Sequence, residues 1–203
     1  MLFRNEKVYR KKYKTLAGVD EAGRGPLAGP VVVAAVILDP KLRIEGLNDS
    51  KKLSASKREE LYEIIINSAI DWKIEIVSPA IIDEINILQA TLLGMEKVVL
   101  KLKERPKICL IDGNKIPRRI KKFSEAIVKG DGKFASIAAA SILAKVTRDR
   151  LMKKLHHEHP EYNFLQNKGY PTREHLAAIN KFGILLCHRK SYRPVQEYIL
   201  DCE

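Results

Sequence analysis

The apolar positions of this chain form short uninterrupted runs, separated by stretches in which apolar residues recur every three or four positions. The runs at about 14–20, 30–38, 107–112 and 126–129 have glycine or proline close to their ends, and this predicts buried strands. Residues 72–78 alternate apolar and polar side chains instead, a pattern typical of a strand at the edge of a sheet.

Helical patterns fill the intervals between these strands. The first helix is expected to begin at Ser54 or at Ser56, where Glu59 would complete a capping box. Strands that alternate with helices predict the α/β class. Further helices are predicted over about 78–103, 134–157, 172–182 and from about 191.

Three segments have special features. The helix over 78–103 is expected to break near Asn86. The helix over 134–157 carries a face of alanine and serine, and such small residues let a helix lie close against a sheet. Residues 1–13 are strongly basic, and we expect them to be a partly mobile lead-in to the first strand.

Composition limits the possible functions. The 203 residues suit one medium-sized domain, and 37 basic against 25 acidic residues give a net charge of +12. Such an excess favours a polyanionic partner, nucleic acid first and an anionic membrane surface second. The sequence has no apolar stretch long enough to span a bilayer and no apolar signal-peptide core. Three cysteines without metal-ligand spacing favour reduced thiols and a cytoplasmic location.

Residues 19–30 are the most informative stretch, because two adjacent acids, Asp20 and Glu21, are followed by a turn rich in glycine and proline. Adjacent carboxylates repel each other at the end of a strand, and a divalent cation would offset that repulsion. The glycines allow a phosphate or a sugar hydroxyl to approach the backbone, and Arg24 adds a positive charge. The alternative is a surface hairpin with two solvated acids. A dinucleotide-binding turn is excluded because a strand follows where a helix is required.

Two further acids repeat this pattern. Asp112 ends a buried strand, and Asp131 lies in a turn after another. Ligands bind beside the carboxyl ends of strands in open α/β sheets, so the four acids could hold two hard cations and cleave a phosphodiester. Spacing alone does not establish that they converge.

Several basic segments leave alternatives open. Residues 115–122 could contact nucleic acid or form a solvated loop, and Lys145 and Arg148 could face substrate phosphate or simply solvate the surface. The three histidines near residue 158 fit a helix C-terminus better than a metal site, because their charge suits the helix dipole. They are His156, His157 and His159.

Taken together, these motifs resemble those of ribonuclease HII, the type 2 ribonuclease H family. The resemblance covers about residues 14–195 in consistent order, and its most specific part is the run Asp20 to Pro30. The other matching stretches are 48–53, 111–113, 129–131, 139–150 and 168–172.

The resemblance implies an α/β fold, a ribonuclease H-like core at about 14–158 with a mixed central sheet flanked by helices, and a helical C-terminal part at about 160–203. It implies a monomeric endonuclease that needs Mg²⁺ or Mn²⁺. Its substrates would be RNA/DNA hybrids and duplex DNA with single embedded ribonucleotides, cut on the 5′ side to leave 3′-hydroxyl and 5′-phosphate ends.

The same resemblance assigns roles to particular residues. Metal ligands would be Asp20, Glu21, Asp112 and Asp131. The turn at Gly23, Arg24 and Gly25 would contact the ribose 2′-hydroxyl, and Tyr170 would lie under the sugar at the RNA–DNA junction. The remaining expected substrate contacts are Asn48, Ser50, Lys51, Lys145 and Arg148.

Two other classes of function remain open at this stage. A different metal-dependent nuclease or resolvase on the same core would cut an all-DNA duplex. A non-catalytic hybrid-binding module would bind tightly without metal-dependent turnover, although the intact set of four acids argues against it.

Overall fold

A five-stranded mixed sheet forms the centre of the protein. The structure is a computed structural model that describes residues 2–201. The strand order is β3-β2-β1-β4-β5; β2 pairs antiparallel with both β1 and β3, whereas β1, β4 and β5 run parallel. The strands are β1 (Leu16–Ala22), β2 (Val31–Ile37), β3 (Asp71–Val77), β4 (Ile108–Asp112) and β5 (Ser124–Ile127).

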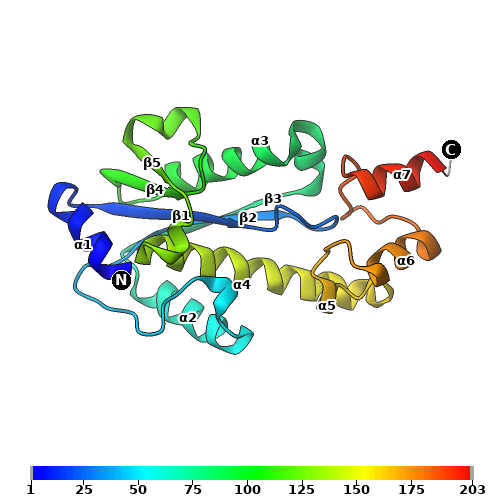
Figure 1. Ribbon diagram of the computed structural model, residues 1–203, viewed down its shortest axis with the longest axis horizontal. Helices are drawn as coiled ribbons and strands as arrows, with labels where there is room; N and C mark the ends of the chain where they lie inside the picture. Colours follow the sequence, from blue (N-terminus) through cyan, green and yellow to red (C-terminus); the bar gives the residue numbers. More distant parts are fainter. Residues whose placement is uncertain (1, 202–203) are drawn as a thin grey trace.

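Helices cover both faces of this sheet. In Figure 1, α3 lies on one side of the strands, and α4 and α2 lie on the other. The helices α5, α6 and α7 gather at the end of the sheet opposite α1 (Figure 1). The helices are α1 (Leu2–Lys12), α2 (Ala55–Ser68), α3 (Pro79–Leu100), α4 (Ala135–Glu158), α5 (Phe164–Asn167), α6 (Arg173–Phe182) and α7 (Arg193–Asp201).

Most of the predicted elements are confirmed, within a few residues at their ends. Strand β3 is an edge strand, as its alternating pattern indicated. Helix α3 has a left-handed residue at Asn86, with φ of 64°, at the predicted break. Thr172 caps α6 and Gly183 follows its last residue, as expected. The last strand ends at Ile127, so it begins and ends earlier than the predicted 126–129.

In the N-terminal half, one expectation was wrong and one open choice is decided. Residues 2–12 form the helix α1, not a mobile lead-in, because Glu6 is 3 % exposed and accepts a hydrogen bond from the Ser136 N–H at the start of α4. This carboxylate satisfies one of the unpaired N–H groups in the first turn of α4. Ser54 caps α2 by accepting from Lys57 N–H, so the alternative cap at Ser56 is not used.

The first strand and α4 approach each other unusually closely, as the small-residue face predicted. A Cβ on Gly18 would lie 2.1 Å from the backbone carbon of Ser136. The residues Ala138, Ala139 and Ala140 of α4 are fully buried in the same layer. Glycine on the strand and alanine on the helix therefore set how close α4 lies to the end of β1.

The C-terminal helices pack on the long β1–β2 connection. Leu27 and Ala28 of that connection share a core with residues of α4, α6 and α7, among them Met152, Ile179 and Val195. Within residues 2–201, no helix has the length and apolar character needed to cross a bilayer.

We predict that Gly18→Ala lowers the free energy of unfolding by about 3 kcal/mol or more, because the added methyl group meets backbone atoms that cannot move away. Urea unfolding followed by circular dichroism measures this. Gly132→Ala is the control, since a Cβ there meets nothing within 4 Å and its φ is not positive. Equal stability of the two variants would contradict the close-packing argument.

Candidate active site

Three neighbouring parallel strands bring the acids to one edge of the sheet. Asp20 and Glu21 lie near the end of β1, Asp112 ends β4, and Asp131 lies in the 3₁₀ turn Gly130–Gly132 after β5. The Oδ1 atom of Asp112 accepts a hydrogen bond of 2.6 Å from Gly130 N–H, which ties the end of β4 to the turn that carries Asp131. The convergence that spacing left open is therefore explained by strand order.

A cavity of about 370 Å³ lies beside these strand ends and contains most of the predicted site. It is lined by Asp20, Glu21, Ala22, Gly23, Arg24, Gly25, Ser50, Lys51, Asp112, Ser141, Lys145, Arg148 and Tyr170. Two predicted residues are not in the lining: Asn48 is exposed and accepts from its neighbour Asp49 N–H, and Asp131 lies next to the cavity and is 9 % exposed.

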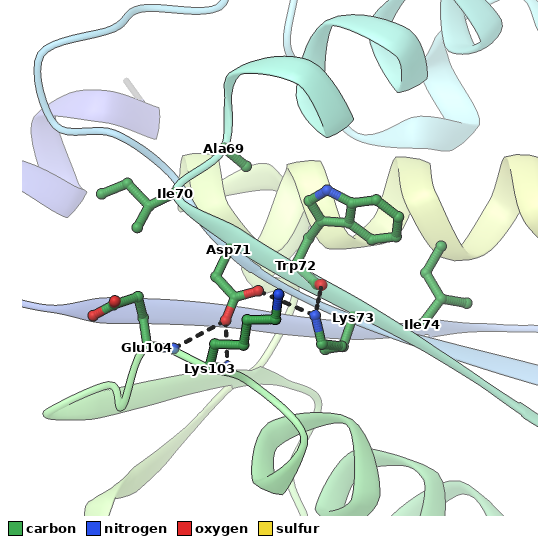
Figure 2. Close-up of a pocket in the computed structure, with 8 residues that line it drawn as sticks. All are labelled: Ala69, Ile70, Asp71, Trp72, Lys73, Ile74, Lys103 and Glu104. Atoms are coloured by element: carbon green, nitrogen blue, oxygen red, sulfur yellow. Dashed lines mark hydrogen bonds and ion pairs between the residues drawn. The ribbon is translucent and has the colours of Figure 1, made fainter.

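Larger hollows elsewhere on the surface have no comparable group of acids. Figure 2 shows one of about 490 Å³ beside the edge strand β3. Its buried Asp71 accepts hydrogen bonds from the backbone N–H groups of Lys103 and Glu104, at 2.5 and 3.0 Å, and from Lys73. Asp71 therefore anchors the chain after α3 to the start of β3, and its role is structural.

Ionisation of these acids costs free energy in the fold. Burial, followed by the charges of Glu21 and Asp112, raises the pKa of Asp20 well above its usual value. Burial also raises the pKa of Glu21, although Arg24, at 3.5 Å from its carboxylate, opposes the shift. Burial and the nearby Asp49 and Asp112 raise the pKa of Asp131. A positive charge among these groups would stabilise their ionised forms.

This donor set fits a hard divalent cation by its chemistry. Carboxylate oxygens crowded at a strand end are the ligands that Mg²⁺ and Mn²⁺ prefer. Within the described part of the chain, however, no three acids, histidines or cysteines are arranged closely enough to hold an ion as they stand. Three of the carboxylates instead accept from backbone N–H groups, Asp112 from Gly130, Asp20 from Glu21 at 2.7 Å and Asp131 from Gly132 at 2.9 Å.

A buried arginine that the sequence analysis did not select shapes the glycine turn. Arg189 is fully buried and donates to the carbonyl oxygens of Gly23, Arg24 and Gly29, at 2.6–3.0 Å. Because the peptides are trans, the N–H groups of Arg24 and Gly25 point to the opposite side from these carbonyls. The turn therefore directs its carbonyls inward to Arg189.

Arg148 is placed differently from its predicted role as a phosphate contact. Its side chain is 1 % exposed, and its guanidinium donates to the carbonyl oxygens of Ala28, Pro30 and Lys168 at 3.0–3.1 Å. A Cβ on Gly23 would lie 2.1 Å from its Nε atom. Arg148 thus packs against the turn and holds the backbone of the β1–β2 connection in place. Sequence alone did not show this, because helical spacing does not reveal which carbonyl groups lie opposite a side chain.

Other predicted contacts surround the cavity. Lys145 pairs with Asp149 at 2.7 Å, and the Ser50 hydroxyl lies 2.9 Å from that of Ser141. Ser141, on the small-residue face of α4, was not predicted as a site residue because serine there resembled a packing residue. The Tyr170 side chain is 46 % exposed in the cavity wall.

Tyr170 and the glycine turn lie directly against each other. A Cβ on Gly25 would lie 3.3 Å from the Cε1 atom of the Tyr170 ring. The backbone next to the turn is also hydrogen-bonded to the backbone next to Tyr170, because Leu27 N–H donates to Gly169 O at 2.7 Å. The turn and the ring thus line adjoining walls of the cavity, and the part of the cavity that they line beside the acids is the slot.

This arrangement agrees with comparison to known proteins. The sequence model of the family Ribonuclease HII matches residues 17–195. The chain belongs to the ribonuclease HII family. A ribonuclease HII of Shewanella loihica is 54 % identical over 188 residues, which cover 92 % of this chain and 90 % of that protein. One from Endomicrobium trichonymphae is 53 % identical over 191 residues, covering 94 % and 91 %.

Solved structures support the same assignment. The crystal structure of ribonuclease H2 from Pyrococcus horikoshii superposes with a TM-score of 0.78 at 29 % identity, covering 92 % of this chain and 98 % of that one. The ribonuclease HII of a PCNA complex from Archaeoglobus fulgidus gives 0.75 at 32 % identity, covering 88 % and 95 %. This ribonuclease HII chain therefore has the expected ribonuclease H-like fold and is a metal-dependent nuclease.

We predict that Asp20→Asn makes the protein more stable in the presence of a chelator, by about 1–2 kcal/mol at pH 8, because the cost of burying this carboxylate and its repulsion from Glu21 and Asp112 are both removed. A carboxyl with a raised pKa is least favourable to the fold above that pKa, so the gain should shrink as the pH falls. Urea unfolding at pH 8 and pH 5 measures both values. Asp39→Asn, in a turn outside the cavity, is the control. A loss of stability in Asp20→Asn at pH 8 would contradict the repulsion argument.

Proposed function

We propose that this nuclease cleaves RNA in RNA/DNA hybrids and incises duplex DNA on the 5′ side of single embedded ribonucleotides. The cavity that combines three acids, a rigid glycine turn and an exposed tyrosine ring carries this proposal. The net charge of +12 suits a polyanionic substrate, whose phosphates would exchange counterions for lysine and arginine. The unpaired Cys109 and Cys187 suit a reducing cytoplasm, where we expect the protein to act as a monomer.

The four acids would hold two divalent cations, Mg²⁺ or Mn²⁺. Asp20 would hold them together with Glu21 and Asp112, whose charges both act on its carboxylate. Bound there, the cations would supply an activated water and stabilise the charge that develops on the phosphate, leaving 3′-hydroxyl and 5′-phosphate ends. The protein's own contribution is to hold the carboxylates at fixed strand ends, so that little reorganisation accompanies the reaction.

The glycine turn is suited to recognise a ribose. Only the 2′-hydroxyl distinguishes RNA from DNA at one nucleotide, and it can both donate and accept a hydrogen bond. The N–H groups of Arg24 and Gly25 face away from the buried Arg189, and a turn with little side-chain bulk lets a sugar come close to them. We infer that these backbone groups contact the 2′-hydroxyl.

Tyr170 would complete the recognition from the other side of the slot. Its ring lies against Gly25, so a sugar bound at the turn would have the adjacent nucleotide over the ring. A deoxyribose fits closely on a flat ring, and a 2′-hydroxyl at that place would crowd it. Tyr170 would therefore favour DNA next to the ribonucleotide, which is the junction that single-ribonucleotide incision requires. Ser50, Lys51 and Lys145, in the cavity wall, would contact the backbone of the bound strand.

We predict that Asp112→Asn lowers cleavage by at least a thousandfold with little change in fold. The amide keeps the shape, and its oxygen can still accept from Gly130 N–H, but the negative charge that attracts a cation is lost. The assay is a DNA duplex with one ribonucleotide, incubated with Mg²⁺ or Mn²⁺, with the cut position mapped on a sequencing gel. Near wild-type turnover at saturating metal would contradict the ligand role. Equal cutting of an all-DNA duplex by the wild-type protein would contradict ribose recognition.

We predict that Tyr170→Ala lowers the ratio of single-ribonucleotide incision to cleavage inside a long hybrid by about tenfold, since aromatic contacts to nucleotides contribute on the order of 1–3 kcal/mol. Tyr170→Phe is the matched control, because it keeps the ring and removes only the hydroxyl. The ratio in Tyr170→Phe should stay close to that of the wild-type protein if the ring face, and not the hydroxyl, contacts the substrate. An unchanged ratio in Tyr170→Ala, with the fold intact by circular dichroism, would leave Tyr170 as a packing residue.

A further inference from the structure

Two histidines outside the cavity lie buried under the Tyr170 segment. His175 of α6 is fully buried and His188, just before Arg189, is 1 % exposed. Their Nε2 atoms are 3.1 Å apart, and their ring centroids are 5.3 Å apart. Both rings pack on aromatic side chains, with Phe164 at 5.3 Å from His175 and Tyr162 at 5.4 Å from His188.

The backbone groups at the two ends of this pair fix the position of every proton between them. Leu185 N–H donates to His188 Nδ1 at 2.8 Å, so a neutral His188 carries its proton on Nε2. That proton then points at His175 Nε2, which must accept it. His175 therefore carries its own proton on Nδ1, where it donates to the Tyr170 carbonyl oxygen at 2.9 Å.

We propose that this pair positions Tyr170 against the Gly23–Gly25 turn through a one-directional chain of hydrogen bonds, and that it does so only while both rings are neutral. His175 and His188 would then be positioning residues for the proposed junction recognition by Tyr170. The activity test of this role rests on that proposed function. The chain runs from Leu185 N–H through His188 and His175 to the Tyr170 carbonyl.

The location of His188 links both walls of the slot. Its neighbour Arg189 holds the carbonyls of Gly23 and Arg24, while His188 itself holds Tyr170 through His175. Ala28 and His188 also form an isolated antiparallel bridge. The dipeptide at 188–189 therefore sets the distance between the tyrosine ring and the glycine turn.

The surroundings favour the neutral form of both rings. Burial lowers the pKa of His175, and burial together with the neighbouring His175 lowers the pKa of His188 to about 4. The other titratable groups that face the pair are Tyr162 across the rings, His159, whose charge opposes protonation of His188, and the adjoining Cys187. Neither imidazole has a carboxylate partner in the described part of the chain. A proton added to either ring would place two N–H groups face to face.

The first test is NMR of the imidazole nitrogens in the ¹⁵N-labelled wild-type protein, which needs no substrate. We expect His188 as the Nε2–H tautomer and His175 as the Nδ1–H tautomer, with His188 unprotonated down to about pH 5, one unit above its pKa. The exposed His157, which lies outside the buried pair, serves as the internal reference for the spectra. A reversed tautomer, or protonation of either buried ring near pH 6.5, would overturn the proposal.

The second test compares two amide substitutions that each keep one half of the chain. His175→Asn places an N–H group near the former Nδ1 position and can still donate to the Tyr170 carbonyl, but it loses the hydrogen bond with His188. His175→Gln places an oxygen near the former Nε2 position and can accept from His188, but it loses the hydrogen bond to the Tyr170 carbonyl. Each variant leaves one buried partner unpaired, so both should lose similar stability.

The activity ratio then separates positioning from packing. We expect His175→Gln to lower the ratio of single-ribonucleotide incision to long-hybrid cleavage about tenfold, and His175→Asn to stay within about threefold of wild type. His157→Asn should leave the ratio unchanged. Equal losses in the two His175 variants would show that the pair only fills space and would overturn the proposal. If Tyr170→Ala itself leaves the ratio unchanged, the junction role of Tyr170 fails, and the NMR result alone decides on the histidine chain.

Discussion

Two buried arginines that bond to backbone carbonyls hold the candidate site together. Arg148 and Arg189 have no carboxylate partner in the described part of the chain, and their guanidinium groups instead donate to carbonyl oxygens of the β1–β2 connection. An unpaired buried charge would be very costly, so these carbonyls must stay turned inward. The outward direction of the opposite N–H groups, on which the proposed ribose contact depends, follows from this constraint. Removing either arginine would therefore disturb the turn without touching the acids.

The acids depend on a different constraint, the parallel order of β1, β4 and β5. Parallel neighbours end at the same edge of the sheet, so carboxylates at the ends of three strands meet whether or not they attract each other. Their repulsion is offset only partly by Arg24 and Lys51. The site is thus stabilised by the rest of the fold and not by its own contacts, which is typical of a centre prepared for a positive ligand.

The C-terminal helices have a direct part in the site, although they lie far along the chain from the acids. The segment at 167–170 is fixed by Asn167, whose side chain bonds both Tyr162 O and Gly169 N–H, and by Arg148 from α4. The segment at 188–189 reaches the glycine turn. Tyr170 and the acids therefore come from different parts of the chain that pack against each other at the β1–β2 connection.

The sequence by itself determined the α/β class, the edge strand, the break at Asn86 and the stretches that carry the acids, because periodicity, helix caps and glycine spacing are local properties. It also predicted the close approach of α4 to the sheet, since small residues show this directly. The sequence did not determine that Arg148 supports a turn, that Glu6 caps α4, or that Arg189 and the histidine pair shape the slot. Those roles depend on which carbonyl or N–H group lies opposite a buried side chain, and only tertiary packing decides that.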